Sequence, residues 1–497
     1  MRSLATEQVR LLENEAAARL GLARRESGYG RAALSAAYGP EAAAAADRAD
    51  HRGLLAAAGD DPLGTWTRLF AVGTTVSDQA AAEAFAPLGL DEALACGLLR
   101  RSSGGVAAGW GLQFVGELAL FSDQRPNTTG GRSRDHVLGI GGASELLLDV
   151  TLRSEARTAL DLGTGCGVQA LALAGRAETV TATDLSDRAL AFAALNAEVN
   201  GVELELLRGD LLEPVAARRF DLVVANPPFV VATPGVGWTY RDGGREADGI
   251  AAELAAASTR LLNPDGTMQF LANWLHVRGT DWSERVAAWL PETGARAWVV
   301  EREVLDPLDY VRTWQRDSGE SGDAEQAAAW LDWFDAHDVE GVGFGMVNVR
   351  RIEGPSDIVC EEAGHAVETP WSDRVADWFA VRGADLSPET LWESRLRLAE
   401  GVTLRQAAEL GAEGWEVDRQ WLRQRHGMRY AEEVDPLLVG FLGACDGETE
   451  VRLQVRLLAD AYGAETAMLY ARLHPIVHRL IERGFLTVRT TGPTAAA

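Results

Sequence analysis

The residues best suited to chemistry form an Asn-Pro-Pro-Phe turn from Asn226 to Phe229. The four apolar residues before it, 222–225, predict a buried strand. The two prolines that follow lack backbone N–H groups and have fixed φ angles, so they hold the chain in one rigid bend. The bend presents Asn226 at the carboxyl end of a strand, where open α/β sheets bind their ligands. With Phe229 close by, the turn predicts a site for something flat that carries nitrogen.

A second cluster, Asp161-Leu-Gly163-Thr-Gly165-Cys-Gly167, stands at a predicted strand-to-helix junction. Glycines at such a junction let the backbone approach a ligand closely, and the following helix offers free N–H groups. The glycines alone fit either a dinucleotide loop or a tight turn. The Asp161 carboxylate favours neither a pyrophosphate nor any other anion, because it would repel one; it suits a cationic ammonium or sulfonium.

Two further acids end the next predicted strands. Asp184 is placed to accept hydrogen bonds from both hydroxyls of a ribose, and Asp210 from the exocyclic amino group of an adenine. With Asp161 they line one edge of the sheet and match a ligand that has an ammonium, a ribose and an adenine but no phosphate. S-adenosylmethionine is such a ligand, and we predict it as the cofactor. We also expect Leu211 and Asn226 to contact it.

Residues 157–275 resemble the class I S-adenosylmethionine-dependent methyltransferases that carry an Asn-Pro-Pro-Tyr/Phe motif. That group includes adenine- and guanine-amino methyltransferases and the HemK-type enzymes that methylate a glutamine amide. The resemblance implies a Rossmann-like, seven-stranded α/β sheet with a reversed last strand. It also implies catalytic roles for the Asn226 side chain and the Pro227 carbonyl, which would accept two N–H bonds of a planar nitrogen and free its lone pair. Phe229 would stack on the plane of the base or amide.

The sequence gives two opposed clues to the substrate. Phe229 in place of tyrosine is similar to ribosomal RNA amino-methyltransferases, whereas Tyr240-Arg-Asp242-Gly-Gly244 is similar to a segment of the glutamine methyltransferases. We favour a guanine or adenine amino group in RNA, with a protein glutamine amide as the alternative. A third reading is a non-catalytic, cofactor-binding regulator of nucleic acid. The intact motif argues against that reading.

The elements that must position these residues alternate between strands and helices, which is typical of a doubly wound parallel sheet. We expect strands ending near 162, 184, 210 and 225, and three more at 267–274, 295–304 and 341–351. An insertion at 305–340 contains an acidic segment, 317–323, expected to be a mobile loop. Seven tryptophans between Trp274 and Trp333 indicate core packing beneath the insertion, or alternatively a lid that stacks on the substrate. The glycine-rich segment 135–144 is either a cover over the site or a plain connector.

The flanks of this region predict two winged-helix-like modules. Short helices followed by a Gly104-Gly105 turn suggest one module near the amino end, and a helix ending in Arg-Gly-Phe-Leu suggests another near residue 485. We predict four domains, namely a mainly helical, winged-helix-like domain at 1–125, the methyltransferase domain at 126–355, a helical connector at 356–434 and a winged-helix-like domain at 435–491.

Composition limits the partners. The chain of 497 residues has a net charge of −26 and no lysine, so all 47 of its basic residues are arginine, and non-specific attraction to nucleic acid is excluded. No run of 18 apolar residues predicts a membrane span. Four widely spaced cysteines predict reduced thiols and a cytoplasmic location. His474 and His478 have the spacing of metal ligands on a helix but no third ligand nearby, so we expect no metal site.

Overall fold

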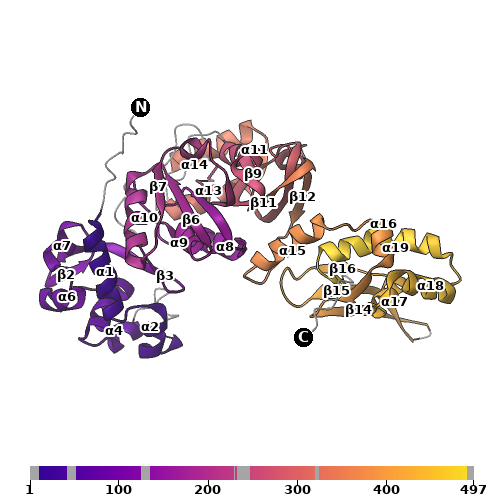
Figure 1. Cartoon of the computed structure of the whole chain (residues 1–497), viewed down its shortest axis with the longest axis horizontal. Coiled ribbons are helices and arrows are strands. Elements are labelled where there is room, and N and C mark those ends of the chain that lie inside the picture. Colours follow the sequence, from indigo (N-terminus) through magenta and orange to yellow (C-terminus); the bar gives the residue numbers. More distant parts are fainter. Residues whose placement is uncertain are drawn as a thin grey trace. The chain divides into compact units, whose positions relative to one another are not determined.

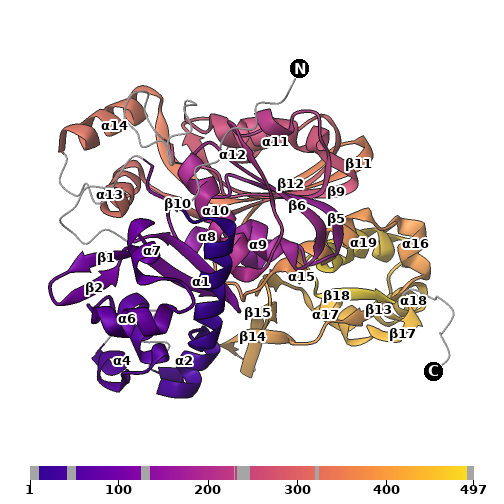
Figure 2. The same cartoon turned by 60° about the vertical axis from the view of Figure 1, so that its left-hand side comes forward.

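The computed structural model of the chain describes residues 11–41, 52–124, 135–228, 230–231, 247–318, 324–412 and 414–489. Two compact units divide the chain, Met1–Gly364 and His365–Ala497. The first unit combines a helical N-terminal flank with a large α/β core (Figures 1 and 2). Within the described ranges, no helix is both long enough and apolar enough to cross a membrane.

The core contains one large sheet in which most neighbours are parallel. From edge to edge its strands are β12 (Asp357–Glu362), β10 (Thr293–Leu305), β11 (Val339–Pro355), β9 (Leu262–Val277), β8 (Phe220–Ala225), β5 (Ala156–Leu162), β6 (Ala177–Asp184) and β7 (Glu205–Arg208). The α/β class and the reversed strand are confirmed, because β11 runs antiparallel to both of its neighbours.

The predicted count of seven strands is wrong, since the sheet has eight. The extra strand is β12, which lies parallel to β10 with Arg296 opposite Asp357. It begins two residues after β11 ends, so a tight reversal and not a helical crossover leads into it. A prediction built on strand–helix alternation stopped at residue 355 and did not count it.

Helices cover both faces of this sheet (Figures 1 and 2). They are α8 (Gly142–Val150), α9 (Val168–Ala174), α10 (Asp187–Asn200), the short 3₁₀ turn η2 (Glu213–Val215), α11 (Gly249–Leu261), α12 (Trp282–Ala287), α13 (Pro307–Ser318) and α14 (Ala324–Ala336). Burial on both faces explains why the central strands are almost continuously apolar. In β8, for example, Leu222 to Ala225 are all buried.

The insertion between β10 and β11 forms the helix pair α13 and α14. Its predicted acidic loop falls largely on residues 319–323, which lie outside the described residues. The tryptophan prediction is supported in its first form, because Trp274 and Trp298 are fully buried in the core and Trp330 is buried within the insertion, in one cluster with Tyr310.

The N-terminal flank consists of short helices and two β-hairpins. Its elements are α1 (Asn14–Glu26), α2 (Arg31–Tyr38), α4 (Arg52–Ala57), α5 (Pro62–Trp66), the π-helix η1 (Thr67–Val72), α6 (Asp78–Phe85), α7 (Leu90–Ala95), β1 (Leu99–Ser102), β2 (Gly105–Ala108), β3 (Trp110–Val115) and β4 (Leu118–Asp123). The predicted Gly104-Gly105 turn joins β1 to β2. Trp66 and Phe85 stack at 4.5 Å in the centre of the flank.

Side-chain amides attach this flank to the core. Asn196 and Asn200, one turn apart on α10, exchange hydrogen bonds with the backbone of Phe121 and Ala119 on β4, at 2.8 to 2.9 Å. Each amide both donates and accepts, so the two side chains bond to β4 as a neighbouring strand would. The flank and the core therefore share one hydrophobic cluster that includes Phe192 of α10.

The second unit combines helices with two three-stranded sheets, β17-β13-β18 and β14-β15-β16. Its elements are α15 (Ser372–Gly383), α16 (Pro388–Glu393), β13 (Arg395–Leu398), β14 (Val402–Gly411), β15 (Gly414–Gln424), β16 (Ala431–Glu433), α17 (Pro436–Gly443), β17 (Asp446–Glu450), α18 (Val451–Tyr462), α19 (Thr466–Glu482) and β18 (Leu486–Arg489). The helical connector predicted at 356–434 is wrong, because five strands lie in it. Strands β14 and β15 were missed because they are largely exposed, and alternation of apolar and polar residues marks a strand only where one face is buried.

Candidate active site

The glycine loop between β5 and α9 lies at the carboxyl end of β5 and forms one part of the candidate site. Gly163, Gly165 and Gly167 all have positive φ angles, of 72°, 55° and 89°, which side chains rarely allow. The backbone N–H groups of Gly163 and Thr164 both donate to the Thr183 carbonyl of β6 at 2.9 Å. The loop is thereby fixed across the ends of two adjacent strands.

Asp161, near the end of β5, is buried and engaged within this loop. One of its carboxylate oxygens accepts hydrogen bonds from the Thr164 hydroxyl at 2.6 Å and from the Ala170 N–H at 3.0 Å. Burial raises the pKa of Asp161 to about 7, against those two hydrogen bonds, which lower it. The carboxylate joins the loop to the first turn of α9, and its predicted contact with a cationic ligand stays a prediction.

Asp184, at the end of β6, meets the loop from the neighbouring strand. Its Oδ2 accepts from the Gly165 N–H at 2.9 Å, and its Oδ1 accepts from the Ser186 N–H at 2.8 Å. Burial raises the pKa of Asp184 as well. A carboxylate has about four acceptor positions, and backbone N–H groups of Gly165, Leu185 and Ser186 bond to this one, which leaves room for a ligand hydroxyl group.

Asp210 follows β7 and is half-buried. The adjoining Gly209 donates its N–H to the Asp184 carbonyl at 3.1 Å, so the second and third acids lie at adjacent strand ends. Leu211 has a φ of 42°, a left-handed conformation that is uncommon outside glycine. Strain of this kind is found at sites where the fold fixes a ligand contact.

The Asn-Pro-Pro turn lies directly beside the glycine loop. Strands β5 and β8 are parallel with Leu162 opposite Ala225, so the residues that follow them are neighbours. A methyl group placed on Gly163 would lie 4.0 Å from the Asn226 carbonyl oxygen. Asn226 is half-buried and Pro227 is buried. Phe229 and the segment 232–246, which includes Asp242-Gly-Gly244, lie outside the described residues.

We call the three acids and the glycine loop the cofactor side of the site, and Asn226 to Val231 with their supporting contacts the substrate side. Gly163 has no side chain to fill the space toward the Asn226 carbonyl, and the Asp184 carboxylate bonds to Gly165 of the same loop. These donors and acceptors suit S-adenosylmethionine chemically, and the assignment of Asp161, Asp184 and Asp210 to its ammonium, ribose and adenine stays a prediction.

The substrate side has a support that the sequence did not reveal. The Tyr310 hydroxyl of α13 accepts the Val231 N–H at 2.8 Å, and the Trp330 indole N–H of α14 donates to the Val231 carbonyl at 2.8 Å. Asn273 of β9 donates to the same Tyr310 hydroxyl at 2.9 Å. Both backbone groups of Val231, five residues after Asn226, are thus held by the insertion.

One sequence signal for this support existed. Asn273 interrupts the apolar run of β9, and a buried polar side chain needs a partner. Its partner, Tyr310, is 37 residues away in a segment that has no recognisable motif. Burial in the insertion raises the pKa of Tyr310, so the hydroxyl stays neutral and keeps its proton.

The glycine-rich segment 135–144 is fastened from two sides. The Gln113 side-chain amide of β3 both donates to and accepts from the Ile140 backbone, at 3.1 and 2.8 Å, and Gln169 of α9 donates to the Ser144 carbonyl at 2.9 Å. A Cβ on Gly139 would lie 2.2 Å from the Gln113 side-chain oxygen, so a larger residue there would have to displace the Gln113 amide from Ile140.

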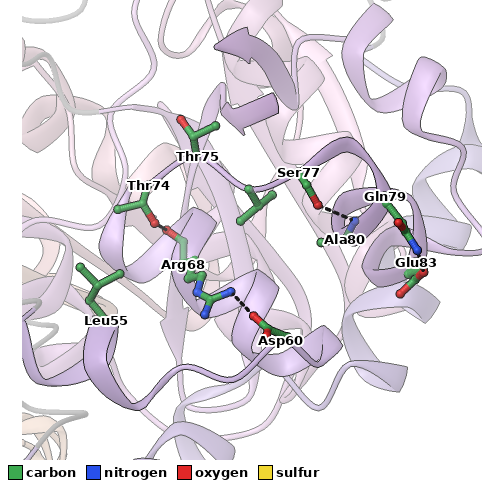
Figure 3. A pocket seen from close by; sticks show the side chains of 10 residues that line it. Leu55, Asp60, Arg68, Thr74, Thr75, Ser77, Gln79, Ala80 and Glu83 are labelled. Carbon is green, nitrogen blue, oxygen red and sulfur yellow. Dashed lines mark hydrogen bonds and ion pairs between the residues drawn. The ribbon is translucent and has the colours of Figure 1, made fainter. Parts of the chain in front are cut away.

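A separate pocket of about 430 Å³ lies in the N-terminal flank (Figure 3). Arg68 on its wall donates to Asp60 at 2.9 Å, and Gln79 donates to Glu83 at 3.0 Å. None of the predicted site residues lines it, and these polar groups already bond to one another. Across the described ranges, no group of three His, Cys, Asp or Glu residues could hold a metal ion, and that includes the surroundings of His474 and His478.

Comparison with known families decides what the core is. Residues 138–278 match the model of the methyltransferase small domain. The core carries a methyltransferase small domain. This match covers the glycine loop, the three acids and Asn226. The resemblance predicted from those residues is confirmed, and with it the expectation of S-adenosylmethionine as cofactor.

The flanking regions match two families described only as domains of unknown function, DUF7059 at residues 26–109 and DUF7782 at residues 369–488. Neither match assigns a role to the flanks.

Curated relatives of the methyltransferase small domain fall into two groups. A release factor glutamine methyltransferase of Lactococcus lactis is 44% identical over 73 residues, or 14% of this chain and 27% of that protein. One from Bordetella pertussis is 36% identical over 170 residues, covering 31% of this chain and 60% of its own. A ribosomal RNA small subunit methyltransferase C of Citrobacter koseri is 30% identical over 230 residues, covering 43% and 59%. The chain thus spans less than two thirds of each of these relatives.

Proposed function

We propose that the chain is an S-adenosylmethionine-dependent N-methyltransferase that acts on a planar amino or amide nitrogen of a macromolecule. The observation that carries this proposal is that Asn226 lies beside Gly163 of the glycine loop. The same loop bonds to Asp184 through Gly165.

In this proposal each side of the site has a separate task. Bound S-adenosylmethionine supplies an electrophilic methyl group. Asp161, Asp184, Asp210, Leu211 and the loop glycines bind it. The Asn226 side-chain oxygen and the Pro227 carbonyl accept the two N–H groups of the target nitrogen and orient its lone pair, while Phe229 stacks on the target plane. Orientation together with charge stabilisation supplies the rate, and no strong base is required.

For the substrate we propose a guanine or adenine amino group in RNA. The relative whose match to this chain is longest among the three above is a ribosomal RNA methyltransferase, with 230 residues. The flanks would then dock the RNA, and a base flipped out of its stack would reach the turn.

Three features favour the alternative, a protein glutamine amide. The net charge of −26 opposes binding to a polyanion. The helix α7, which would enter a nucleic-acid groove if the flank were a winged helix, has Asp91 and Glu92 in its first turn and no basic residue. Two of the relatives above are release factor glutamine methyltransferases with higher identity over shorter segments.

We further propose that both flanks are winged-helix domains. In the N-terminal flank, the first helix is formed by α5 and η1, and helices α6 and α7 follow it. A bridge joins Val76, just before α6, to Val106 of the hairpin β1–β2, which would be the wing. The second unit has a similar order, namely helix α17, strand β17, helices α18 and α19, and strand β18. The central strand of the β17-β13-β18 sheet, β13, comes earlier in the chain than α17. A winged helix that included β13 would begin before the proposed boundary at 435.

The function is tested by offering the full-length protein labelled S-adenosylmethionine together with RNA, and separately with protein, from a strain that lacks this gene. Methylated nucleosides and methylated tryptic peptides are then read by mass spectrometry. We expect methyl transfer to RNA, and we expect Asn226→Ala to reduce it by roughly 10²- to 10³-fold, as for loss of a transition-state hydrogen bond, with cofactor affinity retained.

Each other result has a definite meaning. Transfer to peptides alone would replace the RNA substrate with the glutamine amide. Full activity of the Asn226→Ala variant would contradict the mechanism, and no transfer to either pool would contradict the function.

A further inference from the structure

The strands β14 and β15 form a long antiparallel hairpin in the second unit, which we call the β-arm (residues 402–424) (Figure 1). Four large apolar side chains on it are exposed, with Leu410 at 71% and Trp415 at 74% exposure, and Leu404 and Val417 at 42% and 48%. Leu410 lies opposite Trp415, and Ala408 opposite Val417, so these side chains share one face of the arm. Leu410, Trp415 and Val417 are neighbours near the tip, while the hydrogen-bonded pair Gln406–Gln420 separates them from Leu404. Exposed apolar side chains grouped in this way mark an interaction surface.

The outer edge of the arm is regular. Strand β14 is the outermost strand of the β14-β15-β16 sheet and runs for 10 residues. The one irregularity in the hairpin is the extra residue Asp418, which belongs to β15, so the backbone of β14 keeps its alternation. A long edge strand presents a row of N–H and C=O groups that can pair with another strand.

The sequence of β14 is complementary to itself. Antiparallel pairing of two copies centred on Ala407 places Arg405 of one copy opposite Glu409 of the other, because these residues are equally distant from Ala407. The same symmetry places Leu404 opposite Leu410. Directly opposed residues across an antiparallel pair interact, and opposite charges stabilise the pair while like charges destabilise it.

The hairpin alone leaves these charges poorly matched. Within the arm, Glu409 lies opposite Glu416. Arg405 lies opposite Trp421, and both Arg405 and Glu409 are exposed. Among the described residues, neither Arg405 nor Glu409 forms an ion pair. A second copy would place a cation beside the two glutamates.

We infer that the β-arm is a dimerisation element and that its partner is β14 of a second copy of this chain. The two three-stranded sheets join edge to edge about a two-fold axis through Ala407, which is the self-complementary geometry of a two-fold dimer. Arg405 and Glu409 form two equivalent ion pairs, and Leu404 packs against Leu410 on the face that carries Trp415. The inference does not depend on the proposed catalytic function.

Charge exchange tests both the dimer and its register. The molar mass of the full-length protein is measured by analytical ultracentrifugation over a concentration series for the native protein, Arg405→Glu, Glu409→Arg and the double variant. We expect the native protein and the double variant to dimerise, since exchange preserves the opposed pairs. Each single variant opposes like charges, and we expect its dimer dissociation constant to rise at least tenfold.

Mixing the two single variants supplies the decisive control. Arg405→Glu and Glu409→Arg are complementary to each other, so an equimolar mixture should form a heterodimer although neither variant dimerises alone. Both substituted positions are exposed, and circular dichroism should show unchanged folding. A monomeric native protein, a dimer unaffected by the single variants, or a mixture that stays monomeric would each overturn the inference.

Discussion

The cofactor side of the site is assembled from segments close in the sequence, whereas the substrate side depends on residues far from the motif that they support. Asp184 reaches Gly165 across 19 residues, and Asp161 reaches Ala170 across nine. Val231 is held by Tyr310 and Trp330 across 79 and 99 residues. One side is therefore a property of the small domain itself, and the other joins that domain to an insertion that the family model does not cover.

Because of this difference, cofactor binding and methyl transfer can vary independently. A change in the insertion can move the Asn-Pro-Pro turn without touching the acids, since Tyr310 and Trp330 contact the chain after Asn226. Cofactor affinity and transfer rate should accordingly respond to different substitutions. Four predictions test whether they do, in order of decreasing effect.

The first concerns pH and the cofactor side. Burial raises the folded-state pKa of Asp161 to about 7 from an ordinary value of 3.8. The folded state then binds more protons than the unfolded state between about pH 4 and pH 7. The contribution of Asp161 to stability is therefore greatest at low pH and falls by up to about 1.4 kcal/mol per pH unit through that window.

Urea unfolding of the native protein and of Asp161→Asn, repeated from pH 4.5 to pH 8, measures this difference. The native protein should lose stability relative to the variant as pH rises, with no further change above about pH 8. Parallel curves would show that Asp161 titrates normally, and Asp357→Asn, at the far edge of the sheet, serves as the control.

The second prediction concerns Asp184. Asp184→Asn keeps one acceptor oxygen but loses the charge, and hydrogen bonds to charged groups contribute about 1.5–3 kcal/mol. The dissociation constant for S-adenosylmethionine, measured by calorimetry, should rise roughly 10- to 100-fold. Hydrogen exchange at the Val231 amide should not change, and a change there would mean that the two sides are not independent.

The third prediction concerns Tyr310. Tyr310→Phe removes the acceptor for the Val231 N–H and for Asn273, and an unsatisfied buried donor costs about 1–3 kcal/mol. The maximal transfer rate should fall roughly tenfold while cofactor affinity stays within about twofold, and the Val231 amide should exchange faster. Tyr470→Phe makes the same chemical change in the second unit, where the hydroxyl bonds to the Pro388 carbonyl, and should leave both quantities unchanged.

The fourth and smallest effect is expected at Trp330. Trp330→Phe leaves the Val231 carbonyl without its donor, and an unpaired carbonyl is tolerated better than an unpaired N–H. We expect a decrease of a few-fold in the transfer rate. Trp333→Phe is the matched control, because Trp333 of the same helix packs on Phe334 and His337. Among the hydrogen bonds of the described residues, none joins Trp333 to Val231. Equal losses in both variants would reduce the role of Trp330 to packing.

The parts that sequence reasoning predicted share a physical reason. The runs that end at Asp161 and Ala225 are largely apolar, and the run that ends at Asp184 alternates threonine with Val180 and Ala182. Such residues suit strands of a parallel sheet whose two faces are buried, so the strands and their shared carboxyl edge follow directly. The acids could be placed side by side without any knowledge of the helices between them.

The parts that were missed have equally definite reasons. Strand β12 follows a tight reversal and not a helix, and β14 and β15 are too exposed for a clear alternation of apolar and polar residues. The hydrogen bond from Val231 to Tyr310 depends on how α13 packs, which no local pattern encodes. Phe229, on which the choice of substrate was first based, lies outside the described residues, and that choice stays a prediction.

The side-chain amide of Asn196 forms a third hydrogen bond in addition to the two that it exchanges with β4. Besides the backbone of Phe121, it donates to the Cys166 carbonyl of the glycine loop at 2.8 Å. One buried side chain thus joins the N-terminal flank to the loop that faces the cofactor. A ligand that binds the flank and displaces Phe121 would therefore change the affinity for the cofactor. By thermodynamic reciprocity, the cofactor would change the affinity for that ligand by the same factor.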